Sequence, residues 1–187
     1  RQPSGALNSS RRPCACGKFP AVESVYRTLE GQHVPAILTT AALKAGDTNR
    51  AKAYAVELLQ NLDVTLDSWN YGNMIYDYNS LLGQIALSEG KPDEAAKFLL
   101  AAGKTPGSPQ LNSFGPSFTL AKALLQQGRP EDRATVAKFL DDVAVFWANP
   151  DKETYSLYKE MKVKNREQIE AWKKEILDGK IPTDRKW

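Results

Sequence analysis

Histidine and cysteine are almost absent from this chain of 187 residues, which contains one His and two Cys. The histidine, His33, has no Ser or Cys motif near it and no metal-ligand spacing around it, so we expect neither a catalytic His nor a metal site. Cys14 and Cys16 are separated by one residue, which would strain a mutual disulfide, and a metal site would need two more ligands. We interpret the pair as incidental, while bonded, free and ligating cysteines all stay open.

Motifs of the common enzyme classes are also missing. The chain contains no P-loop, no glycine-rich dinucleotide turn and no HExxH motif. Carboxylates are common, but none forms a recognisable pair for general acid–base catalysis. We therefore expect a protein that is not an enzyme, with no catalytic residue and no cofactor. An enzyme that uses a groove between helices is the least favoured of our hypotheses.

Long apolar runs and alternating strand patterns are absent as well. No apolar run approaches the roughly 18 residues that a membrane-spanning helix needs, and no alternating run of four or more competes with a helical pattern. The net charge is +3, but residues 1–20 hold four basic residues and no acidic one, whereas the remainder holds 21 basic and 22 acidic residues. A nucleic-acid-binding domain would more often carry a basic face on its body. We expect no nucleic-acid partner and no membrane span.

Residues 1–20 are predicted to form an irregular basic arm, rich in Pro, Ser, Gly and Arg, that precedes one helical domain at 21–187. Such an arm becomes ordered where it lies on the body or on a partner, so docking through it in a homo- or hetero-oligomer is one hypothesis. The sequence begins at Arg1, either because a signal segment was removed or because the chain was trimmed. We favour an exported protein, periplasmic or extracellular, over a cytoplasmic one.

Helical periodicity runs through the body and predicts an all-α fold. Its units are three helix pairs at about 34–61, 71–103 and 113–147. The turn of each pair holds a glycine: Gly46, Gly90 and Gly128. The central helix, from Tyr71, is apolar over so much of its surface that it should be flanked on two sides.

The last segment, 152–179, is predicted to cover the exposed end of the row of three helix pairs. Its inward face is made by three apolar residues, Ile169, Trp172 and Ile176, and Gly179 stops it. Asn165 with Gln168 matches a capping box, which predicts that a helix begins there. The segment is heavily charged, and a polar outer face on a final helix closes the exposed end of a solenoid.

The middle pair carries the most specific pattern. It combines a Leu-Gly step, a turn glycine, two small residues on the second helix and a closing proline, at Leu82-Gly83, Gly90, Ala95, Ala102 and Pro106. This pattern resembles the tetratricopeptide repeat (TPR), in which small residues let two helix backbones approach closely. The turn glycines are 44 and 38 residues apart, against about 34 in that repeat, so the surplus is expected in loops.

Three further features extend the pattern across residues 34–182. They are Gly72-Asn73, the linker Thr105–Pro116, and a Trp-x3-Ile-x2-Gly ending at Trp172, Ile176 and Gly179. Together they resemble a group of uncharacterised bacterial TPR-like proteins. The resemblance implies a TPR-like α-solenoid of about three helix hairpins with a C-terminal capping helix, and it implies no particular activity. Relatives often carry histidines at the positions of Tyr76 and Asp77, which argues against a shared catalytic His.

By the same resemblance, the first helix of each pair lines a concave face. The residues expected to bind a partner there are Thr40, Asn73, Tyr76, Asp77, Ser80, Gln84, Phe118 and Lys122. A mixture of aromatic, amide and carboxylate groups suits the binding of a peptide backbone or tail. The alternative is an ordinary solvated helix face.

The linker Thr105–Pro116 is the second candidate site. As a binding loop it would present the hydrogen-bonding side chains of Gln110, Asn112 and Ser113 at the edge of a groove. In the structural alternative, Pro106-Gly107 forms a turn, Asn112 or Ser113 caps the next helix, and Pro116 lies in its first turn.

Two functions are consistent with these patterns. The leading hypothesis is a non-enzymatic helical-repeat scaffold that binds a protein or peptide segment. The alternative is a structural subunit of a larger or extracellular assembly, docked through residues 1–20.

Overall fold

The computed structural model describes residues 34–60, 69–152, 156–183 and 187. These parts form eight α-helices and one 3-10 helix, and they contain no strand, which confirms the prediction of an all-α chain for the described residues. The helices are α2 Val34–Lys44, α3 Thr48–Gln60, α4 Tyr71–Ser88, α5 Pro92–Gly103, α6 Pro109–Phe114, α7 Thr119–Leu125, α8 Pro130–Trp147, η2 Pro150–Lys152 and α9 Ser156–Leu177. The basic arm, both cysteines and His33 lie outside the described residues.

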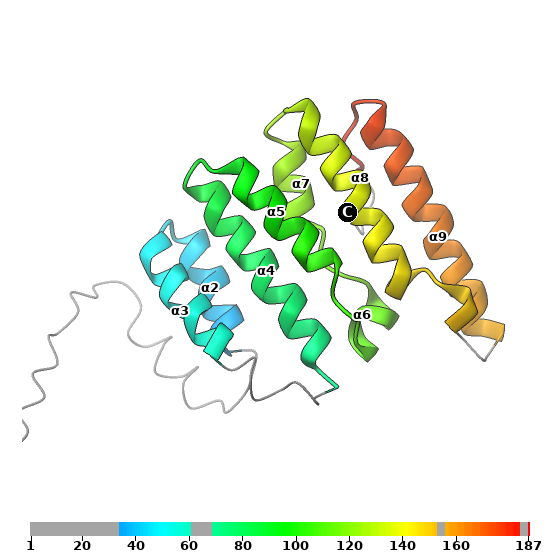
Figure 1. Ribbon diagram of the computed structural model, residues 1–187, viewed down its shortest axis with the longest axis horizontal. Coiled ribbons are helices and arrows are strands. Elements are labelled where there is room, and N and C mark those ends of the chain that lie inside the picture. Colours follow the sequence, from blue (N-terminus) through cyan, green and yellow to red (C-terminus); the bar gives the residue numbers. More distant parts are fainter. Residues whose placement is uncertain (1–33, 61–68, 153–155, 184–186) are drawn as a thin grey trace, which may run out of the picture.

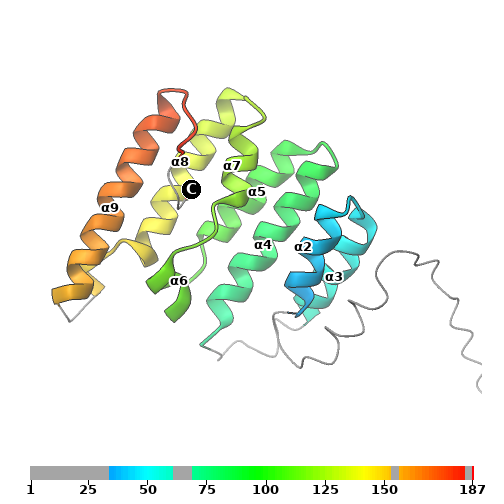
Figure 2. The same ribbon diagram turned by 180° about the vertical axis from the view of Figure 1, so that it is seen from behind.

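The helices stand side by side in a row, with α2 and α3 at one end and α9 at the other (Figures 1 and 2). Three pairs pack internally, α2 with α3, α4 with α5, and α7 with α8. Between pairs, α4 contacts α2 and α3, α7 contacts α4 and α5, and α8 contacts α5. The central helix α4 is therefore flanked on two sides, as its nearly all-round apolar sequence predicts.

Short glycine turns connect the helices within each pair. Gly46, Gly90 and Gly128 have φ angles of 74°, 72° and 75°, a left-handed conformation that glycine adopts without steric cost. A β-carbon on any of the three would meet no atom within 4 Å. The turns thus require glycine for its backbone freedom and not for close packing.

The third pair differs from the expected helix beginning at residue 113. Two short helices, α6 and α7, precede α8 in place of one. Gly115, with φ of 82°, ends α6, and Pro116 follows it, which disfavours continuation of the helix. A β-carbon on Gly115 would lie 2.6 Å from the Trp147 ring. The helix is therefore broken at the residue whose backbone packs directly against the Trp147 indole.

The capping segment also differs from its prediction, because α9 runs without interruption from Ser156 to Leu177. Asn165 lies inside this helix and does not begin one. Its side chain Nδ2 donates to the carbonyl oxygen of Trp147 at 3.2 Å. The prediction that a helix begins at Asn165 was thus wrong. The Asn165 side chain instead caps a backbone carbonyl at the end of the neighbouring helix α8.

The main core lies between α4, α5, α7, α8 and α9. Its aromatic centre consists of Tyr76, Phe118, Phe139, Phe146, Trp147 and Trp172. Ala95 and Ala102 on α5 are completely buried, and Gly83 on α4 lies against the side chain of Leu120 on α7 so closely that a β-carbon would overlap it. Small residues therefore permit close helix packing, with Gly83 doing so between pairs. Within the described residues, none of the helices is both long and apolar enough to cross a membrane.

Candidate functional site

Two of the expected concave-face residues, Tyr76 and Phe118, belong to the core. The Tyr76 side chain is 2% exposed, and its hydroxyl donates to the carbonyl oxygen of Ser117 at 2.5 Å. Burial raises the pKa of Tyr76 far above its usual value. Phe118 packs edge-on against Phe139 and Trp172. Neither ring projects into solvent as a groove residue would, because both fill the space between α4, α7 and α8.

Asn73 and Ser80, expected on the same face, are buried as well. Asn73 Nδ2 donates to Asn70 Oδ1 at 2.5 Å and to Gln110 Oε1 at 3.1 Å, and its Oδ1 accepts from Ser108 Oγ at 2.5 Å. The Asn73 amide therefore ties the start of α4 to the linker. A side chain with these bonds has little hydrogen-bonding capacity left for a partner.

The other four expected residues keep part of their surface exposed, namely Thr40, Asp77, Gln84 and Lys122. Thr40 Oγ1 donates to the carbonyl oxygen of Ala36 at 3.0 Å, and Gln84 Nε2 donates to that of Ser80 at 3.3 Å. They come from α2, α4 and α7, the first helices of the three pairs, which contact one another in that order. Of the eight residues predicted for the concave face, these four are therefore the ones that a partner could reach.

The linker is fastened to α4 along much of its length. Thr105 Oγ1 donates to the carbonyl oxygen of Gly72 at 2.7 Å. Ser108 caps α6, since its Oγ accepts from the amide of Leu111 at 3.1 Å, so the cap is neither Asn112 nor Ser113. Helix α7 begins after Phe118 with no side-chain cap, and Pro116 lies before that helix.

The three predicted linker residues have different surroundings. Gln110 is half-buried and bonds to Asn73, whereas Ser113 is exposed. Asn112 is half-buried, and its carbonyl oxygen accepts from the amine of Lys162 in α9 at 2.5 Å. Of the three predicted residues, Ser113 alone is exposed, which supports the structural alternative for Gln110 and Asn112.

Lys162 and Trp187 are two important residues that the sequence patterns do not single out. Lys162 is 2% exposed and also donates to the carbonyl oxygen of Phe146 at 3.3 Å. No local pattern marks a buried lysine inside a charged helix. The capping role of Ser108 was visible in principle, because a serine followed by proline is typical of a helix start.

A hollow of about 380 Å³ opens beside α7. It is lined by Ser117, Phe118, Thr119, Lys122, Ala123, Gln126 and Trp187. Its floor is aromatic, because Trp187 stacks on Phe118 with ring centres 5.1 Å apart and planes 12° apart. Its rim is polar, with the hydroxyls of Ser117 and Thr119 bonded to each other at 2.9 Å. The hollow therefore combines stacking surface, hydrogen-bonding groups and one cation.

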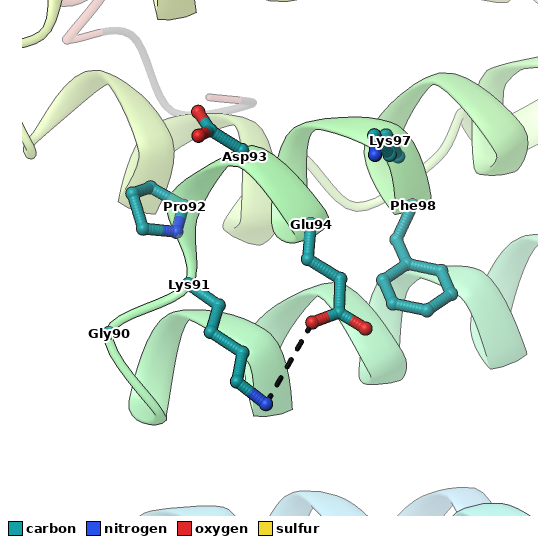
Figure 3. A pocket seen from close by; sticks show the side chains of 7 residues that line it. All are labelled: Gly90, Lys91, Pro92, Asp93, Glu94, Lys97 and Phe98. Atoms are coloured by element: carbon teal, nitrogen blue, oxygen red, sulfur yellow. Dashed lines mark ion pairs between the residues drawn. The ribbon is translucent and has the colours of Figure 1, made fainter.

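A second hollow, of about 610 Å³, lies at the start of α5 and is lined by Gly90, Lys91, Pro92, Asp93, Glu94, Lys97 and Phe98 (Figure 3). The side chains of Lys91 and Glu94 point toward each other and form an ion pair at 4.0 Å. Lys91 also bonds to Glu89 at 2.9 Å. The pKa of Glu89 is lowered by its hydrogen bonds to Lys52, which has the larger effect, and to Lys91. The charge of Lys91 in this hollow is thus offset by Glu89 and Glu94.

Metal-ligating side chains do not gather at either hollow. In the ranges that the structure describes, no group of three or more His, Cys, Asp or Glu residues is placed to hold a metal ion. No protein-family model, curated protein or solved structure matches the sequence.

Proposed function

We propose that this chain is a non-enzymatic, TPR-like helical scaffold that binds a peptide segment of another protein on the surface formed by α2, α4 and α7. The observation that carries the proposal is the hollow beside α7. It offers an aromatic floor, a polar rim and the amine of Lys122 on the helix that follows α2 and α4 in the row.

Partly exposed polar residues also lie on α4, the helix that packs against α7. Asp77 and Gln84 on α4 are spaced seven residues apart, so they lie on the same side of that helix. Lys122 on α7 and Asp77 on α4 supply charges of opposite sign on neighbouring helices. Complementary charges at a rim fix the register of a bound segment more than they add affinity.

Hydrogen bonds that hold the linker to α4 and α9 to α8 support a binding function over a purely structural use of the helices. The linker is held to α4 by Thr105 and Ser108, and α9 is held to α8 through Asn165 and Arg166. A pre-organised surface loses less conformational entropy when a partner binds. The arm at residues 1–20, on which the alternative of an assembly subunit depends, lies outside the described residues.

A peptide library displayed on phage tests the proposal with the full chain. We expect selected peptides to bind the native protein, and Asp77→Lys to weaken them at least tenfold. Glu160→Lys is the matched control, because Glu160 is an exposed residue of α9 with the same change in charge. If no peptide is selected, or if both variants bind every peptide equally, the proposal is wrong.

A further inference from the structure

The last residue of the sequence, Trp187, occupies the aromatic part of the hollow beside α7. Its ring stacks on Phe118 and lies 5.2 Å from the Trp172 ring at an angle of 59°. Phe118 and Trp172 are 3% and 1% exposed. Because Trp187 lies flat on Phe118, its departure would uncover one face of that ring. A hollow without Trp187 would therefore be larger and would offer one face of Phe118 to a planar group.

The Trp187 side chain is less buried than the rings of Phe118 and Trp172 beside it. Its indole Nε1 is buried and donates to no acceptor among the described residues. A buried donor without a partner costs free energy that a solvated or hydrogen-bonded indole does not lose. The Trp187 side chain as a whole is only half-buried, and it forms one wall of the hollow. These features are those of an occupant that another group can replace.

Lys122 gives the hollow a positive charge that none of the described residues neutralises. Within the described parts of the chain, its amine forms no ion pair or side-chain hydrogen bond. Lys122 and Phe118 are four residues apart, a spacing that places two side chains on one face at the start of α7. A ligand with an aromatic ring and a nearby carboxylate would use both groups.

We propose that the hollow binds an aromatic side chain of a partner peptide, which displaces Trp187 from Phe118 while a neighbouring carboxylate pairs with Lys122. This inference rests on the proposed function and specifies the chemistry of the partner. The reason for an aromatic group is the ring that already lies there, since a site that stacks an indole accepts other planar rings at similar distances. Trp187 competes with the partner's aromatic ring for the same place and thereby lowers the affinity for the partner peptide.

Residues 180–187 supply the sequence of a defined probe. A fluorescein-labelled peptide with the sequence of residues 180–187, KIPTDRKW, carries the tryptophan and a free terminal carboxylate. In fluorescence anisotropy, Trp187→Ala protein should bind it at least tenfold more tightly than the native chain. Trp187→Phe is the matched control, because a phenyl ring still covers Phe118, and it should resemble the native chain. A probe with alanine in place of its tryptophan should not bind.

Lys122 is tested with the same probe in the Trp187→Ala background. Adding Lys122→Met should weaken the free-acid peptide several-fold and leave the amidated peptide unchanged. Binding of the alanine probe as tight as that of the tryptophan probe, or no binding to Trp187→Ala, would overturn the proposal. Equal losses for the acid and amide peptides would overturn the role of Lys122.

Circular dichroism melting first establishes that Trp187→Ala folds. If it does not, the native chain labelled with 5-fluorotryptophan gives the result by fluorine NMR. Millimolar peptide should move the Trp187 signal to the position of an exposed indole, and an unmoved signal would overturn the proposal. Library ligands that bind without moving that signal would keep the proposed function and refute this inference. If the 180–187 peptide binds Trp187→Ala but the library yields no ligand, this inference would be kept and the proposed function refuted.

Discussion

Gly72 at the start of α4 and Gly107 in the linker lie in backbone contact. A β-carbon on Gly72 would fall far inside the van der Waals radius of the Gly107 carbonyl oxygen. Gly72 is helical and buried, so it needs no left-handed backbone, and glycine is required there only for space. The contact brings Gly72 within reach of Thr105, whose hydroxyl donates to the Gly72 carbonyl.

Gly72→Ala is expected to lower the free energy of unfolding by more than about 3 kcal/mol, because the clash is with backbone that a rotamer change cannot relieve. Urea denaturation measures the loss. Gly128→Ala is the control, because its β-carbon meets nothing within 4 Å and only the left-handed backbone opposes it, at about 1–2 kcal/mol. Equal losses in the two variants would contradict the packing explanation.

The sequence predicts the all-α class, the three turn glycines and the flanked central helix because these features depend on local periodicity and backbone preference. It does not predict the division of the first helix of the third pair into α6 and α7. That division depends on the passage of Gly115 against the Trp147 ring, a contact between residues far apart in the chain. Asn165 illustrates the same limit, since a local capping pattern is overridden by the Trp147 carbonyl.

Asn73→Ala should lower the free energy of unfolding by about 1–3 kcal/mol, since it leaves the buried Ser108 hydroxyl without its acceptor. Asn73→Asp should cost more at neutral pH, because it brings a carboxylate against the acceptor oxygens of Asn70 and Gln110. The deficit should shrink on acidification, when the carboxyl becomes a donor. Thermal melts across pH test this order, and an Asp variant as stable as the native chain at neutral pH would contradict it.

Lys162→Met should destabilise the fold by about 1–3 kcal/mol, because the Asn112 and Phe146 carbonyl oxygens lose their shared cationic donor. Hydrogen exchange should also accelerate at the amides of α6, which Lys162 connects to α9. Lys164→Met is the matched control on the same helix. Its side chain is exposed, so a change within about 0.5 kcal/mol is expected. Unchanged exchange in α6 would show that Lys162 does not hold that helix.

The candidate site was predictable only in part, for a physical reason. The residues at positions 73, 76, 77, 80 and 84 can be assigned to α4 from sequence, but the depth at which each lies depends on neighbouring helices. Tyr76 faces the Ser117 carbonyl across the pair boundary, whereas Asp77, the next residue, remains partly exposed. The place of Trp187 on Phe118 has no local signal at all, because it is a contact between the last residue and a helix start.

Tyr76→Phe should reveal the cost of burying a phenol as the pH rises. Burial raises the pKa of Tyr76 above its unfolded value near 10, so above about pH 10 the unfolded chain releases a proton that the folded chain retains. The contribution of Tyr76 is therefore fully present below that pH and declines above it. Below about pH 9 the native chain should exceed Tyr76→Phe by about 0.5–1.5 kcal/mol through the Ser117 hydrogen bond.

Above about pH 10 this advantage should shrink by up to about 1.4 kcal/mol per pH unit. Urea denaturation of both proteins from neutral to alkaline pH measures the difference, in which the titration of all other groups cancels. A difference that stays constant across the range would mean that the Tyr76 hydroxyl ionises equally in the folded and unfolded chains. It would then follow that the phenol reaches solvent, and that the boundary between α4 and α7 is more open than its packed rings indicate.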